Sequence, residues 1–458
     1  MSALENAGNG IGFRERDSSA LAEALQVDRM ALRQRSRDPH AELKTQIHRV
    51  CIARLGSAFT SADGETLAPR VREIVREELG REETPLSPAD RARIEREVAD
   101  DILGYGPLEP FLRDPTISEV MVNGCDSIYV EREGRITETD ASFLDDAHLL
   151  RIIDRIVSQV GRRIDESSPM VDARLPDGSR VNAIIPPLAL RGPSLTIRKF
   201  ARDALALSDL VRLGTVTEQA AEFLGQCVRG KLNMLISGGT GTGKTTLLNA
   251  VSAHIPGAER IVTIEDAAEL RLQQRHVVSL ESRPPNVEGE GEVRIRDLVR
   301  NALRMRPDRI IVGEVRGAET LDMLQAMNTG HDGSLTTVHA NSARDALHRL
   351  EMLVLMAGVE LPVKAIREQV AGGFDLLVHI SRLVDGSRRI VQITEIAGME
   401  GDVITLQDVF TARAAEGAAS GAGQLVAPLE PTSLRPGFLS KLKTNGVDLA
   451  AATWLGAA

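Results

Sequence analysis

A glycine-rich run that ends in a lysine and two threonines is the segment of this sequence best suited to bind phosphate. It follows the apolar stretch 233–237, which has the pattern of a buried strand, and a helical pattern begins at Leu247. In such a run the glycines let backbone N–H groups wrap phosphate oxygens, the lysine reaches the β and γ phosphates, and the next threonine ligates Mg²⁺. The run predicts a site for a nucleoside triphosphate and Mg²⁺, with Thr245 as metal ligand. Its residues are Gly238, Gly239, Thr240, Gly241, Thr242, Gly243, Lys244, Thr245 and Thr246.

Three further apolar runs end in polar residues. They are 260–264 with Glu265, 309–312 with Gly313 and Glu314, and 334–338 with His339. In open α/β sheets ligands bind beyond the carboxyl ends of the strands, so these side chains are candidates to contact Mg²⁺, water or phosphate. Each also has a simpler interpretation: acids at a helix N-terminus around Glu265, a structural carboxylate at Glu314, and loop or core histidines at His331 and His339.

Arginines that precede the glycine-rich run form a second group of candidates. Arg174, Arg180, Arg191 and Arg198 lie in a different predicted domain. Hydrolysis of ATP builds negative charge on the γ phosphate, and an arginine supplied from elsewhere can stabilise that charge. Arginines on a separate domain would make hydrolysis depend on closure of domains or subunits. The alternative is that they form a solvated face.

Changes in residue pattern divide the chain into six predicted segments. Before residue 41 the composition is polar with weak apolar periodicity, which predicts disorder. Apolar residues then recur at helical spacing, followed by strands around one amphipathic helix. From residue 218 strands alternate with helices, which is typical of a mostly parallel sheet. The segments are 1–40 disordered, 41–112 helical, 113–203 α+β, 204–217 linker, 218–412 α/β, and 413–458 linker and C-terminal tail.

The composition of the 458 residues argues against several classes of protein. Lys and Arg number 55 against 65 Asp and Glu, a net charge of −10 (55 − 65), and aromatic residues make up only 3%. Both values count against a nucleic-acid binder that depends on basic charge or base stacking. Three widely spaced cysteines exclude a disulfide framework and fit a reducing cytoplasm. No stretch reaches the ~18 apolar residues that a membrane helix needs.

The ordered motifs resemble the secretion ATPase superfamily of type II and type IV secretion and pilus machines. The superfamily's boxes stand in order: Walker A at 238–245, the aspartate box at 263–269, Walker B at 310–316 and the histidine box at 330–341. Within that superfamily, RPDRIIVGEVRGAE at 306–319 resembles the CpaF branch, and so does MNTGHDGSL at 327–335. CpaF-type ATPases serve tight-adherence (Tad, or Flp) pili.

The resemblance implies a fold and a set of functional residues. The fold is an α/β, RecA-like P-loop ATPase domain preceded by an α+β N-terminal domain and a helical region, assembled as a homohexamer. In this family the Walker B carboxylate is a glutamate, which fits Glu314 after Gly313. His331 would lie near the nucleotide that His339 senses. The implied catalytic residues are Glu265 and Glu314 for the attacking water, His339 for the γ phosphate, and Arg191 and Arg198 from a neighbouring subunit.

The function implied by the resemblance is that of a Mg²⁺-dependent ATPase motor that drives pilin assembly through an integral inner-membrane platform. Such a protein would be cytoplasmic and bound to the inner membrane only through protein partners. Three alternatives remain open. They are a conjugation-type secretion ATPase, a nucleic-acid translocase, which the acidic charge and scarce aromatics disfavour, and a nucleotide-binding scaffold without hydrolysis.

Overall fold

The computed structural model divides into two compact units, Met1–Lys199 and Phe200–Ala458. The predicted disorder at 1–40 lies outside the described residues apart from the last two positions. Most of the Ala- and Gly-rich linker expected after residue 413 also lies outside them. The residues that the structure describes are 39–56, 64–82, 85–132, 134–200, 205–285, 289–414 and 426–455.

Helices that pack around a small apolar core begin the first unit. Their buried residues include Ile47, Val71 and Ile94, which come from three different helices. Helix α5 begins as its sequence predicts, because the Ser87 hydroxyl accepts a hydrogen bond from the Asp90 backbone N–H at 3.1 Å and Pro88 follows the cap. The helices are α2 (Ala41–Leu55), α4 (Gly64–Arg81) and α5 (Pro88–Leu103), and the short η1 (Gly106–Leu108) and α6 (Glu109–Arg113) follow.

A six-stranded antiparallel sheet with one long helix completes the first unit. The strand order is β3-β2-β1-β6-β5-β4. Alternate residues of the strands, such as Leu195 and Ile197, are buried with the apolar stripe of α7, which includes Ile152 and Ile156. This alternation is what a sheet with one covered face requires. The elements are β1 (Ile117–Asn123), β2 (Ile128–Arg132), β3 (Arg135–Glu138), α7 (Asp146–Gln159), β4 (Met170–Arg174), β5 (Arg180–Ile184) and β6 (Ser194–Arg198).

The second unit is built on a nine-stranded sheet whose order is β15-β14-β13-β12-β7-β11-β10-β8-β9. From β12 to β9 the neighbouring strands are parallel, and β12 to β15 are antiparallel. Every residue of β7 is buried, as expected for a central strand with both faces covered. The strands are β7 (Met234–Gly238), β8 (Ile261–Glu265), β9 (Val277–Glu281), β10 (Arg309–Val312), β11 (Leu335–His339), β12 (Leu376–Arg382), β13 (Arg388–Glu400), β14 (Val403–Ala414) and β15 (Val426–Pro431).

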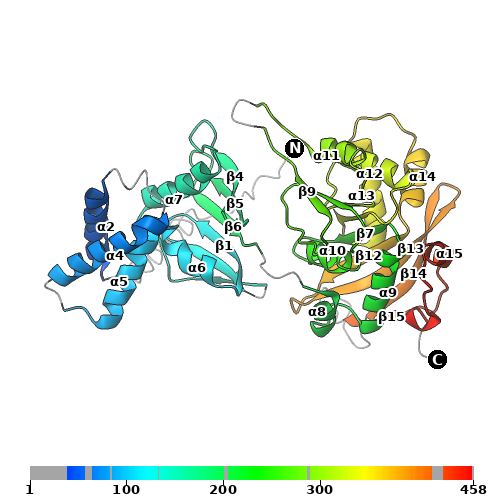
Figure 1. Cartoon of the computed structure of the whole chain (residues 1–458), viewed down its shortest axis with the longest axis horizontal. Coiled ribbons are helices and arrows are strands. Elements are labelled where there is room, and N and C mark those ends of the chain that lie inside the picture. Colours follow the sequence, from blue (N-terminus) through cyan, green and yellow to red (C-terminus); the bar gives the residue numbers. More distant parts are fainter. Residues whose placement is uncertain are drawn as a thin grey trace, which may run out of the picture. The chain divides into compact units, whose positions relative to one another are not determined.

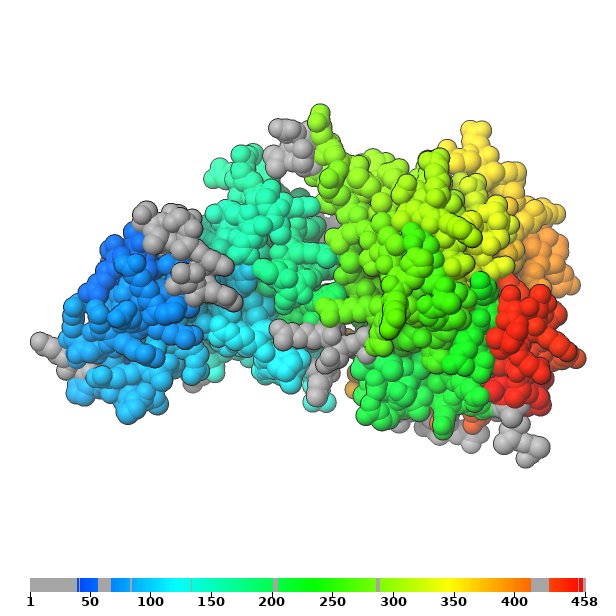
Figure 2. All heavy atoms as spheres, viewed as in Figure 1, coloured from blue at the N-terminus to red at the C-terminus, as the bar shows by residue number. Residues whose placement is uncertain are grey.

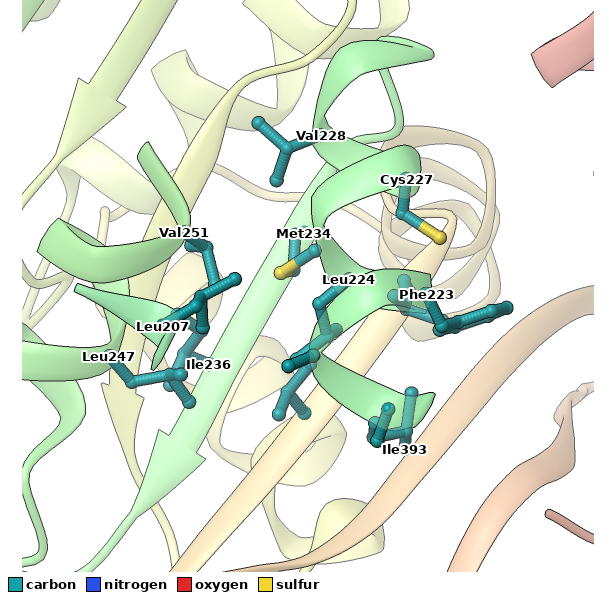
Figure 3. Close-up of a cluster of buried hydrophobic side chains, with 14 of the residues drawn as sticks. Leu207, Phe223, Leu224, Cys227, Val228, Met234, Ile236, Leu247, Val251 and Ile393 are labelled. Carbon is teal, nitrogen blue, oxygen red and sulfur yellow. The ribbon is translucent and has the colours of Figure 1, made fainter. Parts of the chain in front are cut away.

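Helices cover both faces of this sheet (Figure 1). One face packs against α8 (Leu207–Arg212), α9 (Glu218–Arg229) and α10 (Lys244–Ser252). Figure 3 shows Phe223 and Leu224 of α9 in this cluster. Each such side chain, when fully buried, contributes about 1.5–3 kcal/mol. The other face carries α11 (Ile295–Ala302), α12 (Glu319–Asn328), α13 (Ala343–Leu355) and α14 (Val363–Gly373).

The C-terminal segment forms part of the second unit's core, although the sequence led us to expect only a linker and tail at 413–458. Strand β15 pairs with β14, and α15 (Leu439–Thr444) and η2 (Ala451–Thr453) follow. Phe438, Leu442 and Trp454 are buried in the same cluster as α9. In Figure 2 the C-terminal segment, coloured red, lies beside the green surface of the same unit.

The predicted fold class is confirmed. A mostly parallel α/β unit of RecA type follows an antiparallel α+β sheet and a helical region. Among the described residues, no helix combines the length and apolarity needed to cross a bilayer.

Candidate functional site

The glycine-rich loop joins the end of β7 to the start of α10, as predicted. Gly241 and Gly243 have φ values of +69° and +95°, which favour glycine because a Cβ is strained there. A Cβ on Gly238 would lie only 2.4 Å from the Ile380 carbonyl oxygen. The Thr242 hydroxyl donates to the Gly239 carbonyl at 3.0 Å and closes the loop. The loop therefore presents glycine backbone at the N-terminus of α10, where the helix dipole favours an anion.

Lys244 lies over the carbonyl groups of this loop. Its Nζ donates to the Gly238 oxygen at 3.1 Å and to the Gly239 oxygen at 2.8 Å, and the residue is buried. The same Nζ lies 3.2 Å from His339 Nδ1 at the end of β11. Lys244 is therefore held at the loop, next to a second strand end. Thr245 and Thr246 follow it, half-buried, in the first turn of α10.

Glu314 and His339 meet beside Lys244. His339 Nε2 lies 3.0 Å from Glu314 Oε1, an ion-pair distance without hydrogen-bond alignment, and that oxygen is buried with no hydrogen-bond partner. The other oxygen of Glu314 accepts from Arg316 at 2.9 Å. Burial lowers the pKa of His339, against the effect of Glu314 and with a further lowering from Lys244. The imidazole is therefore mainly neutral near pH 7.

Glu265 occupies a different environment from Glu314. It is buried at the end of β8, and its Oε1 accepts from the backbone N–H groups of Glu269 at 2.9 Å and Leu270 at 3.1 Å. A Cβ on Gly313 would lie 2.9 Å from Glu265 Cγ. The glycine that precedes Glu314 therefore leaves room for Glu265, whose carboxylate holds the loop after β8.

The structure corrects the expectation that His331 lies near the phosphates. Strand β11 runs from Leu335 to His339 parallel to β7, so its start is at the edge of the sheet opposite the glycine-rich loop. His331 precedes that start, and its Nδ1 lies 3.2 Å from the Ala326 carbonyl oxygen of α12. His331 and His339 are close in sequence but are separated by the whole length of a strand.

Arg191 and Arg198 belong to the first unit and are exposed. Arg198 ends β6, and its Nε forms an ion pair with Glu119 Oε1 on β1 at 3.1 Å. Arg191 lies in the loop between β5 and β6, where its backbone oxygen approaches Gly124. Both side chains are on the surface, where another protein surface could reach them.

Sequence reasoning did not identify several side chains around the loop. Arg316 contacts Glu314 and also lies 3.5 Å from Asp266 Oδ2. Its position two residues after Glu314 is the sequence feature that could have identified it. Buried His379 of β12 shares a hydrogen bond of 2.9 Å with the Ser237 hydroxyl of β7. Arg382 also lies near the loop, through its approach to Gly241. Neither position on β12 carries a recognisable motif.

The site fits a metal ion that a triphosphate brings with it. Within the described ranges, no cluster of three or more His, Cys, Asp or Glu side chains could hold an ion alone. Mg²⁺ bound with a nucleotide needs only one or two protein oxygens besides phosphate and water. Thr245 in the first turn of α10 suits that role.

Comparison with known proteins adds a family match. Residues 101–401 match the family model described as type II/IV secretion system protein. A Mycobacterium tuberculosis protein named for conjugal transfer is 39% identical over 67% of this chain and 89% of its own length. The conjugal transfer protein TrbB of Rhizobium radiobacter is 36% identical over 63% of this chain and 86% of its own. Among solved structures, the VirB11 ATPase of Brucella suis has 30% sequence identity to this chain and a TM-score of 0.35. The match covers 63% of this chain and 95% of the VirB11 chain.

Proposed function

Because the chain belongs to the type II/IV secretion system protein family, we propose that it is a Mg²⁺-dependent ATP hydrolase of a secretion or pilus machine. The observation that carries this proposal is the meeting of Lys244, Glu314 and His339 at one end of the parallel sheet. A phosphate-binding loop with its lysine, next to a carboxylate that can position water, is an arrangement that P-loop enzymes use for phosphoryl transfer to water.

The proposed roles follow from the contacts. Lys244 would exchange the Gly238 and Gly239 carbonyls for the β and γ phosphates. Glu314 Oε1, which is buried without a hydrogen bond, would accept a hydrogen bond from the attacking water, while Arg316 holds the other oxygen. The neutral imidazole of His339, beside both groups, could donate to the γ phosphate and report its loss. When bound with ATP, Mg²⁺ neutralises charge that develops on the phosphates.

Glu265 receives a positioning role in this proposal. Its carboxylate accepts two backbone N–H groups, so it would fix the loop after β8 beside the attacking water rather than bind the water itself. Arg191 and Arg198 would stabilise charge on the γ phosphate of a neighbouring subunit. Their exposure on a separate unit supports that use, and the assembly would be a homohexamer.

We further propose the CpaF-type role in assembly of a Tad (Flp) pilus, because stretches 306–319 and 327–335 resemble that branch. The protein would then act at the cytoplasmic face of the inner membrane through an integral platform protein. A conjugation-type transfer ATPase is the second candidate, since relatives of this chain are named for conjugal transfer. Stimulation of hydrolysis by the cytoplasmic part of a pilus platform protein, and not by that of a conjugation system, would favour the first candidate.

The test of hydrolysis itself uses Lys244→Ala in the full chain. We expect the variant to lose ATP binding and turnover, because the charge that reaches the β and γ phosphates is removed. Binding is measured by calorimetry and turnover by phosphate release with Mg²⁺ present. Wild-type turnover in Lys244→Ala would contradict the proposed function.

A further inference from the structure

Two arginines stand on the side of the glycine-rich loop opposite Glu314. Strands β12 and β13 are paired so that Arg382 and Arg388 are directly opposite each other at the end of the hairpin. Side chains paired in this way share one face of the sheet, with Cβ atoms about 5 Å apart, and like charges there repel.

Both arginines face the glycine-rich loop. A Cβ on Gly241 would lie 3.8 Å from Arg382 Nη1, and one on Gly243 would lie 3.5 Å from Arg388 Cδ. The acid of the intervening turn is used within the turn, because Asp385 Oδ1 accepts from the backbone N–H and the hydroxyl of Ser387 at 2.9 and 2.6 Å. The two arginines therefore place positive charge beside the two glycines that have a positive φ.

The strand order fixes which end of a nucleotide these arginines would meet. Strands β12 and β13 lie on one side of β7, whereas β11 and β10, which carry His339 and lead to Glu314, lie on the other. A triphosphate whose γ phosphate points toward Glu314 has its α phosphate and nucleoside on the hairpin side. This step rests on the proposed function, which sets the direction of the nucleotide.

A pocket next to the hairpin offers room for the nucleoside. It has a volume of about 320 Å³, and most of its lining surface is apolar. The lining includes Val211, Val216, Ile390 and Leu429, together with the charged residues Glu218 and Arg389. Ile390 is the cross-strand partner of Ile380, whose side chain approaches Gly243, so one residue of the pocket lining lies on the same face of the hairpin as the arginines. An apolar lining suits a flat heterocyclic base.

We propose that Arg382 and Arg388 bind the α phosphate of a nucleoside di- or triphosphate and direct its base into the adjacent apolar pocket. Both arginines would then strengthen the binding of ATP and ADP alike, because the α phosphate is common to the two ligands. Lys244 and His339 would instead contact or sense the terminal phosphates.

The test measures nucleotide affinity in full-length Arg382→Ala, Arg388→Ala and the double variant. Loss of a charge-assisted hydrogen bond costs about 1.5–3 kcal/mol, so each single variant should raise the Kd about 10-fold or more. We expect the same factor for ADP and for a non-hydrolysable ATP analogue, with kcat at saturating ATP changed less than about 3-fold. Arg388→Lys should recover part of the affinity. The control is Arg435→Ala, an exposed arginine near the C-terminal helix, which should leave both Kd values unchanged.

Two results would overturn the inference. The first is unchanged Kd values for both ligands in the double variant when its melting temperature is that of wild type. The second is weakened binding of the ATP analogue alone together with a large fall in kcat, which would assign the arginines to the γ phosphate. Failure of the proposed function is distinct, because wild type would then bind neither nucleotide, or Lys244→Ala would bind both normally.

Discussion

The two edges of the nine-stranded sheet use charged side chains in different ways. At the edge where β7, β10 and β11 end, Lys244 donates to backbone carbonyls and Glu314 Oε1 is buried without a hydrogen bond. At the opposite edge, Lys441 of α15 pairs with both Asp332 and Asp375 at 2.8 Å. The paired charges of Lys441 stabilise the fold, whereas the buried oxygen of Glu314 without a hydrogen bond is suited to contact a ligand.

The ion pair between Arg309 and Glu259 also has a structural role at this opposite edge, although Arg309 Nη2 is buried without a hydrogen-bond partner. Arg309 at the start of β10 is completely buried, and its Nε lies 2.5 Å from Glu259 Oε2. A Cβ on Gly333 would collide with the same guanidinium, whose Nη1 donates to the Gly333 carbonyl at 3.2 Å. The arginine that begins the strand is therefore a structural residue, although it lies only a few residues before Glu314.

The largest effect should follow from Glu314→Gln. The substitution keeps the size of the side chain but removes the negative charge that would accept the proton of the attacking water. We expect hydrolysis to fall about 10²–10³-fold, while ATP binding and the melting temperature remain near wild type. Single-turnover kinetics and calorimetric binding separate these effects. Near-normal binding together with near-normal turnover would remove Glu314 from the chemistry.

Glu259→Ala should give the opposite outcome at the other edge. It leaves the buried Arg309 without its carboxylate, and breaking a buried pair in this way costs about 3 kcal/mol. Urea denaturation should detect this loss, with Glu259→Gln giving a smaller one because its amide oxygen can still accept a hydrogen bond. We expect turnover per folded molecule to be preserved. A loss of turnover without destabilisation would mean that Glu259 acts in catalysis and not in stabilising the fold.

We expect a smaller effect on hydrolysis from substitution of His339, and almost none from His331, which lies beyond the opposite end of β11. His339→Gln should slow hydrolysis by about 10-fold, since it removes the imidazole between Lys244 and Glu314. His331→Gln serves as the matched control and should change turnover less than about 2-fold, because it contacts the end of α12 instead. Phosphate-release assays at saturating ATP suffice for both variants. Equal losses in the two would mean that the edges are coupled more tightly than their contacts indicate.

The glycine-rich loop was predictable because its geometry is local. The strand, the loop and the helix are contiguous, and residue type alone specifies the backbone conformation and the lysine. The positions of Glu314 and His339 were also predictable, since both follow apolar runs whose parallel arrangement brings their ends together. The prediction for His331 is wrong because this residue precedes β11 and therefore lies at the end of the strand away from the glycine-rich loop.

Other features depend on partners that are distant in the sequence. The role of Glu265 depends on two backbone N–H groups of the following loop, which residue type does not specify. Strand β3 is exposed along its length and has no apolar alternation to detect. The burial of the C-terminal segment against α9 joins residues about 200 positions apart, which no local pattern specifies. Arg382 and Arg388 face the glycine-rich loop only because β12 pairs with both β7 and β13.

The contact between Gly313 and Glu265 means that these two positions cannot change independently. A methyl group at 313 would lie 2.9 Å from Glu265 Cγ, so Gly313→Ala would push the Glu265 side chain away from the amides that it holds. A shorter residue at 265 would make room for the methyl group but would release the loop. A variant with a side chain at position 313 would therefore need another way to anchor the segment after β8.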